Sequence, residues 1–352
     1  MAASEASPTQ ELMHTVTPLV HSTSLSLLTG CNVWLKCENL QPTGSFKIRG
    51  MGMAAQRALA ENSAQHFVTG STGNAALALA FAGRQLQRPV TVFLPTTTSA
   101  AMQTKIKNEG ASIRLEGQDL EAVISAAHQF AAGRDDCYFI HPFDDETVQT
   151  GHATMLPEIK LQIHHRPPDA LLCGVGGGGL LAGLIRGLQA FGWTDVPVVA
   201  VETHGSNVFQ NCRVNGERAP LSTYKTLATS LGSRYLAAHA FNLSTSHPVI
   251  PFAVSDPMAA NATQLFADDH QAMVEPACGA VLSLLYSGVI RDVLPDLQPS
   301  SHIVVILAGG ADITVDMLYQ YKLKHSNPPT IVKSGSEIYM RLTTDPEAAP
   351  AP

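Results

Sequence analysis

The chain has 352 residues, of which 45% are hydrophobic, and this predicts a large buried core divided between two packed domains. Its formal net charge is −7 and no run is rich in lysine or arginine, which argues against nucleic acid as a partner.

Short apolar strands alternate with helical segments along most of the chain. In chain order, we predict strands at residues 66–69, 89–95, 112–115, 137–141, 170–173, 196–201 and 303–307, and helices at residues 74–86, 101–109 and 120–132. This alternation is typical of a parallel sheet covered by helices on both faces, so we predict an α/β fold. Because the pattern restarts at residue 170, we expect two such units.

The two ends of the chain differ from this pattern. Residues 1–12 are small and polar and are predicted to be disordered, and residues 326–352 form a proline-rich tail that we do not expect to pack. The N-terminal sequence is not that of a signal peptide, and no apolar run reaches the length of a membrane span. The six cysteines lack paired CxxC spacing and are typical of a reducing compartment. We therefore expect a cytoplasmic protein without a membrane partner.

Residues 43–49 read Thr-Gly-Ser-Phe-Lys-Ile-Arg, so that Lys47 follows a small hydroxyl residue by two positions. A lysine in a turn is ordinarily solvated and inert. Gly44 and Ser45 can instead place the amine at the mouth of a cleft, where its chemistry would differ. The segment alone leaves both interpretations open.

Four consecutive glycines, Gly176, Gly177, Gly178 and Gly179, follow a predicted strand and precede a helical sequence. Such a loop can close its backbone N–H groups around a phosphate, and the helix N-terminus adds a favourable dipole. The spacing differs from the dinucleotide pattern GxGxxG and from the nucleotide loop GxxxxGK[ST]. A flexible turn without a ligand is the alternative.

Ser71-Thr72-Gly73-Asn74-Ala75 lies between a predicted strand and a predicted helix. Its hydroxyl residues can cap the helix without any ligand. A helix N-terminus also attracts anions, so the same loop can hold a carboxylate.

Lysine, asparagine loop and tetraglycine loop, in this order and at these separations, resemble the fold type II family of pyridoxal-phosphate (PLP) enzymes, whose fold is that of tryptophan synthase β. Within it the chain is most similar to the serine/threonine dehydratases (L-serine ammonia-lyases), from about Thr17 to Lys324. The resemblance implies two open twisted parallel-sheet domains with the cofactor in the cleft between them. It implies a small domain at 41–145 inserted into a large PLP-binding domain at 13–40 and 146–325, and a homodimer.

The resemblance also implies the roles of individual residues. Lys47 would hold PLP as an imine (a Schiff base), Asn74 would contact the phenolic oxygen of PLP, and the four glycines would hold its phosphate. Phe46 would pack on the pyridine ring, although ordinary core packing is an equal alternative. The residues that would bind the substrate carboxylate are Ser71, Thr72 and Ala75.

Glu202, Ser206 and Leu231 fall where relatives bind a cation such as K⁺ or Mg²⁺ near the phosphate loop. A carboxylate that follows a buried strand can equally cap a turn or join a hydrogen-bonded network.

Two positions depart from the dehydratase pattern. Ala308 stands where these enzymes carry a cysteine or serine that pairs with the pyridine nitrogen, and alanine offers no hydrogen-bonding group. Water or Asp312 would replace that partner, or the nitrogen would stay unpaired, which suits elimination better than a long-lived carbanion. Thr72 stands where close dehydratases have alanine, glycine or serine, and a hydroxyl there is more frequent in β-replacement enzymes.

The resemblance therefore predicts a PLP-dependent lyase of amino-acid metabolism that acts on a small amino acid. It would convert L-serine to pyruvate, or L-threonine to 2-oxobutyrate, with release of ammonia, and Lys47 would take the α-proton. The alternatives are β-replacement or racemisation on the same scaffold, and a relative that binds PLP without catalysis.

Overall fold

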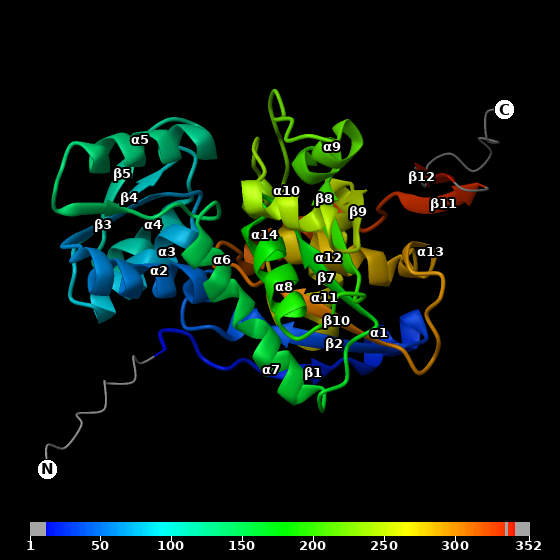
Figure 1. Ribbon diagram of the computed structural model, residues 1–352. Helices are drawn as coiled ribbons and strands as arrows, with labels where there is room; N and C mark the ends of the chain where they lie inside the picture. Colours follow the sequence, from blue (N-terminus) through cyan, green and yellow to red (C-terminus); the bar gives the residue numbers. More distant parts are fainter. Residues whose placement is uncertain (1–11, 335–336, 342–352) are drawn as a thin grey trace, which may run out of the picture.

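The computed structural model describes residues 12–334 and 337–341. Two sheets form separate α/β units, which lie beside each other in Figure 1. The chain leaves the first sheet after Cys37, builds the second sheet between residues 66 and 139, and returns to the first at Ala170. This connectivity agrees with a small domain inserted into a large one, while the boundaries given above stay a prediction.

The large sheet has six strands. In spatial order they are β1 (Leu19–His21), β2 (Asn32–Cys37), β10 (His302–Leu307), β7 (Ala170–Gly174), β8 (Val198–Thr203) and β9 (Val249–Val254). All neighbours are parallel except β1, which pairs antiparallel with β2. The central strands are apolar and buried, as expected where helices cover both faces of a sheet.

Helices pack on both faces of this sheet. One face carries α7 (Met155–Gln162), α8 (Gly179–Ala190), α9 (Val208–Asn215) and α10 (Ala238–Thr245), and α6 (Glu146–Ala153) packs between α8 and α2 (Lys47–Asn62). The other carries α1 (Thr23–Thr29), α11 (Asp256–His270), α12 (Pro276–Tyr286) and α13 (Ile290–Val293), and α14 (Val315–His325) packs on α11. Alternate residues of β7 show this division, because Leu171 packs in the first core and Leu172 in the second.

The small sheet is entirely parallel, in the order β5 (Ser112–Leu115), β4 (Val90–Leu94), β3 (His66–Gly70) and β6 (Cys137–Phe139). Its helices are α2 (Lys47–Asn62), α3 (Asn74–Gln85), α4 (Ala100–Asn108) and α5 (Leu120–Ala132). In Figure 1, α5 lies on the face opposite to α2 and α3. Accordingly Val68 of β3 packs with the α5 residue Val123, and Phe67 packs with α2 and α3.

Short 3₁₀ segments, η1 (Glu38–Leu40) and η2 (Thr229–Leu231), complete the folded core. A two-stranded antiparallel hairpin, β11 (Thr330–Ser334) and β12 (Glu337–Arg341), lies at the side of the large domain away from the small one (Figure 1). This hairpin lies within residues 326–352, where we predict only an unpacked tail. Residues 1–11 and 342–352 lie outside the described residues.

A buried ion network ties α2 to the large domain. The guanidinium of Arg49 donates to both oxygens of Glu38 (2.7 and 2.8 Å) and both oxygens of Glu158 (2.7 and 2.8 Å). The amine of Lys36 donates to Glu158 at 2.5 Å. Arg49, Lys36 and Glu38 have no exposed surface. The network therefore fixes the first turn of α2, which begins at Lys47.

Candidate active site

A pocket opens where the strand ends of the two sheets face each other. Its lining comes from residues 45–47, 71–75, 174–180, 230–232 and 308–309, together with four side chains from neighbouring segments. The loops that follow β3, β7 and β10 all reach it from the carboxyl ends of their strands, where open α/β sheets bind their ligands. The predicted site residues that line it are Phe46, Lys47, Ser71, Thr72, Asn74, Ala75, Gly176, Gly177, Gly178, Gly179, Leu231 and Ala308.

Lys47 is the first residue of α2, and its amine projects into the pocket. The amine donates a hydrogen bond to the carbonyl of Pro142 at 3.2 Å and lies 5.1 Å from the centre of the Phe46 ring. Burial lowers the pKa of Lys47 to about 8, because the charged form loses its hydration. The interpretation of Lys47 as a solvated turn residue is therefore wrong. At pH 7 about one tenth of the amine is then neutral, and this neutral form can act as a nucleophile or base.

Phe46 lines the pocket and also belongs to the core. Its ring contacts the imidazole of His152 edge-on, with 4.7 Å between ring centres. His152 is fully buried, and within the part of the chain that the structure describes neither of its ring nitrogens has a hydrogen-bond partner. Burial holds the pKa of His152 well below its usual value, so the imidazole is neutral. The His152 ring therefore packs against Phe46 and holds it in place.

The tetraglycine loop connects β7 to α8 without room for side chains. A Cβ on Gly177 would lie 2.4 Å from the Phe143 ring, and Gly178 has a left-handed φ of +87°. Gly178 is the N-cap of α8, and among the described residues we find no side chain that accepts from the first N–H groups of this helix. The backbone N–H groups of its first turn are therefore available to an anion in the pocket.

The Ser71 loop brings a second helix N-terminus to the pocket. Gly73 is the N-cap of α3, again without a side-chain cap, so the simple capping interpretation of this loop is wrong. The Ser71 hydroxyl instead accepts a hydrogen bond from the N–H of Gly73 (3.1 Å), which holds the turn, and Thr72 lines the pocket. Both helix ends favour negative charge. The pocket is thus suited to a ligand with two anionic groups.

Comparison with known proteins agrees with this geometry. Residues 11–309 match the family described as pyridoxal-phosphate dependent enzyme. The chain belongs to this family. It is 39% identical over 315 residues to L-serine dehydratase/L-threonine deaminase from Homo sapiens, covering 89% of this chain and 95% of the relative. A second Homo sapiens relative, named serine dehydratase-like, is 41% identical over 307 residues, with 86% and 92% covered.

Among solved structures, a fungal L-serine ammonia-lyase from Rhizomucor miehei superposes with a TM-score of 0.86 at 41% identity. The alignment covers 90% of this chain and 100% of the fungal chain. The predicted family and fold class are therefore confirmed.

The residues of the pocket fit the cofactor of a PLP enzyme. A buried amine with a lowered pKa, a loop of four glycines without side chains and the N-terminus of α8 lie around one cavity. Lys47, Asn74 and the loop Gly176–Gly179 are the groups that would hold it.

Ala308 lines this pocket with a methyl side chain, and Ser45, which pairs with the adjacent Gly309, lines it as well. Asp312, which we considered as a replacement partner for the ring nitrogen, does not line the pocket, and its carboxylate accepts a hydrogen bond from Ser99 at 2.5 Å. The thiol of Cys278 lies behind the loop and donates to the carbonyl of Gly309. The idea that Asp312 substitutes for the missing group is therefore wrong.

Glu202 lies behind the pocket lining and is fully buried. Its two oxygens accept from the N–H groups of Phe209 and Gln210, both at 2.8 Å, so it caps α9. Burial raises the pKa of Glu202 to about 8. The Ser206 hydroxyl donates to the carbonyl of Leu231 at 3.0 Å. The capping role is present, and a cation at these three residues stays a prediction.

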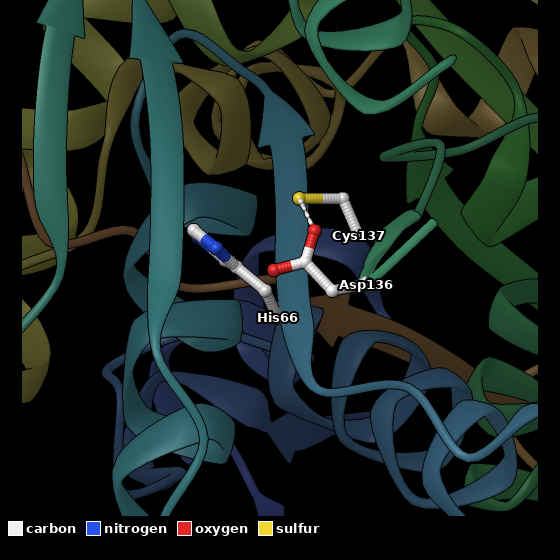
Figure 2. A group of neighbouring side chains, drawn as sticks. All are labelled: His66, Asp136 and Cys137. Carbon is white, nitrogen blue, oxygen red and sulfur yellow. Dashed lines mark hydrogen bonds between the residues drawn. The ribbon is translucent and has the colours of Figure 1, made fainter. Parts of the chain in front are cut away.

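A different group of side chains could hold a metal ion. His66, Asp136 and Cys137 offer ligand atoms within 4.8 Å of one another at the amino ends of β3 and β6 (Figure 2). Their polar atoms already have partners, since His66 bonds Thr91 at 2.9 Å and the Cys137 thiol bonds Asp136. The group lies at the end of β3 opposite to the Ser71 loop and takes no part in the pocket.

Glu275, which precedes α12, is a buried residue beside the site that no sequence motif indicates. Its carboxylate contacts Asn74, Ser230 and the backbone of Asp312. These partners lie between 37 and 201 positions away in sequence, so no local pattern reveals the cluster.

In the described part of the chain, the helices are too short or too polar to span a membrane.

Proposed function

We propose that this chain is a PLP-dependent L-serine/L-threonine ammonia-lyase. It would convert L-serine to pyruvate and ammonia, and L-threonine to 2-oxobutyrate and ammonia. The observation that carries the proposal is the single pocket that joins the Lys47 amine to two uncapped helix N-termini. The names of the relatives support the same reaction.

In this proposal, different residues of the pocket would bind different parts of PLP. The loop Gly176–Gly179 and the N-terminus of α8 would bind the phosphate of PLP, and Asn74 would contact its phenolic oxygen. Phe46 would pack at its ring. Bound PLP supplies an electron sink for the bonds of the substrate α-carbon.

The substrate residues would orient the amino acid for proton removal. The Ser71 and Thr72 hydroxyls and the N–H of Ala75, at the N-terminus of α3, would hold the carboxylate. With the carboxylate fixed, the neutral amine of Lys47 would take the α-proton as a general base. The same group, now protonated, can then assist departure of the β-hydroxyl as water.

Ala308 supports elimination over racemisation, because its own side chain offers no hydrogen-bonding partner to a ring nitrogen there. We expect Ala308→Ser to increase D-serine formation relative to pyruvate by about threefold to tenfold, the effect of one added hydrogen bond. Chiral chromatography of recovered serine, with 2-oxo acid assayed in parallel, measures this ratio. Ala308→Gly, which adds no donor, is the control. An unchanged ratio in Ala308→Ser would mean that this position does not control the reaction.

The lowered pKa of Lys47 predicts how fast the cofactor-free protein captures PLP. The amine must be neutral to react with the aldehyde, so the capture rate should rise with pH and level off above about pH 8. Stopped-flow absorbance between pH 7 and pH 10 measures the rate, and a small amine of ordinary pKa treated alike is the control. A rate that still climbs steeply above pH 9 would contradict the lowered pKa.

The rival PLP reactions give different products from L-serine. β-Replacement would consume an added thiol and form a new amino acid, and racemisation would give D-serine. β-Replacement stays an alternative because Thr72 carries a hydroxyl at a position where close dehydratases have alanine, glycine or serine. We expect 2-oxo acid to be the main product with and without thiol, as measured by mass spectrometry of the reaction mixture.

Three further properties belong to this proposal. A cation, K⁺ or Mg²⁺, would be held by Glu202, Ser206 and the carbonyl of Leu231, beside the phosphate loop. The protein would be a homodimer, and exposed apolar side chains around β1, α1 and α7 support an interface there. It would act in the cytoplasm, in keeping with six cysteines that form no disulfide.

A further inference from the structure

We propose that Glu275 is a positioning residue that holds the small domain against the large one and orients Asn74 and the loop 308–312 around the cofactor. This inference rests on the proposed function for the role of Asn74, but the contacts that carry it belong to the protein alone.

The carboxylate of Glu275 is buried, and only 4% of the residue is exposed. Its oxygens accept from the side-chain amide of Asn74 (3.1 and 3.2 Å), from the N–H of Asp312 (2.9 Å) and from the hydroxyl of Ser230. A buried carboxylate with this many donors is bound by charge-assisted hydrogen bonds, which are stronger than neutral ones. Burial raises the pKa of Glu275, and the donors oppose this increase.

The donors come from both domains. Asn74 begins α3 of the small domain, whereas Ser230 lies in η2 and Asp312 follows β10 of the large sheet. The other end of the Asn74 amide accepts from the N–H of Ala311 at 3.0 Å. With an acceptor at its nitrogen and a donor at its oxygen, the amide has one favourable orientation. Glu275 and Ala311 together therefore fix the side chain that would meet the phenolic oxygen of PLP.

The same loop reaches the segment before Lys47. Ser45 pairs with Gly309, the N–H of Phe46 donates to the carbonyl of Ala308 at 3.0 Å, and the N–H of Gly310 donates to Gly44 at 2.8 Å.

Gly310 also packs directly on Glu275, since a Cβ built there would lie 2.0 Å from the carboxylate carbon. The Glu275 carboxylate thus contacts Asn74 directly and supports, through Gly310, the extended segment at Gly44 that leads to Lys47. Removal of the Glu275 carboxylate oxygens should therefore increase the mobility of residues 71–77 in the small domain and of residues 308–312 in the large one.

Hydrogen–deuterium exchange of the protein without PLP or substrate tests this directly. Glu275→Ala should accelerate exchange in residues 71–77 and 308–312 by about tenfold or more, as expected when several charge-assisted bonds are lost. Exchange in β7 and β8 should be unchanged. Glu275→Gln, which keeps one acceptor oxygen, should give an intermediate effect.

Lys105→Met is the matched control, because Lys105 donates to the carbonyl of Ala311 from the small domain but does not touch Asn74. It should leave exchange in residues 71–77 unchanged. If Glu275→Ala does not fold, Asn74→Asp places a second carboxylate against Glu275 and should accelerate exchange at 308–312 across the domain boundary.

A second readout follows the cofactor. Glu275→Gln should weaken PLP binding and alter the absorption spectrum of bound PLP, while the melting temperature of the PLP-free protein stays near that of the wild type. Acceleration confined to one domain, or a lower melting temperature with unchanged exchange in both loops, would overturn the inference. These measurements use no substrate, so a failure of the proposed lyase reaction would appear separately, as wild-type protein that forms no 2-oxo acid.

Discussion

Lys47→Ala should reduce formation of 2-oxo acid from L-serine by at least about 10³-fold, since it removes the group that holds PLP and the general base together. The variant should still bind PLP through the tetraglycine loop and α8, because these contacts do not involve the lysine. Treatment with borohydride followed by mass spectrometry should fix PLP to the wild-type chain and not to the variant.

Lys105→Ala is a suitable control for the lost charge, since this lysine lies on α4 and does not line the pocket. It should retain both activity and covalent capture of PLP. Turnover by Lys47→Ala within about tenfold of wild type would show that another group removes the α-proton, and the assignment of the pocket would then be wrong.

The largest expected effect on stability comes from the buried ion network. Arg49→Met leaves the carboxylates of Glu38 and Glu158 without their shared guanidinium, and Glu38 has no contact with solvent. Removal of one partner from a buried ion pair costs about 3–5 kcal/mol. We therefore expect the free energy of unfolding to fall by that amount, as measured by urea denaturation of the PLP-free protein.

The same helix offers a matched control. Arg57 pairs with Glu61 at 2.8 Å, but both side chains are more than half exposed. Arg57→Met should change the free energy of unfolding by less than about 1 kcal/mol. Equal losses in the two variants would indicate that solvent reaches the Arg49 network and that it does not fix the start of α2.

Much of the fold could be predicted because apolar strands such as β4 and β10 are uniform, short and followed by clear helical sequences. The strands that were missed lack this uniformity. β2 contains Lys36, whose buried amine donates to Glu158, Gln162 and the carbonyl of Thr17. β9 contains Pro251, which an edge strand tolerates. The antiparallel direction of β1 depends on pairing with β2, which three residues do not specify.

Some residues of the candidate site could likewise be predicted from the sequence, and others could not. The Ser71 loop and the four glycines directly follow strands, and Lys47 stands in a contiguous motif that opens α2, so their chemistry is visible in the sequence. Glu275 and the Arg49 network depend on partners that are distant in sequence, and only the folded chain brings them together. The side chain of Asp312 was misjudged for the same reason, since its orientation is set by Ser99 on the other domain.

The most direct test of the account follows the absorption spectrum of the PLP-loaded protein while L-serine and then L-threonine are added. 2-Oxo acid is assayed in the same cuvette. We predict a spectral change on each addition together with steady accumulation of pyruvate, then of 2-oxobutyrate. A spectral change without any 2-oxo acid would contradict the proposed elimination, and Thr72 and Ala308 would then be the first positions to revert.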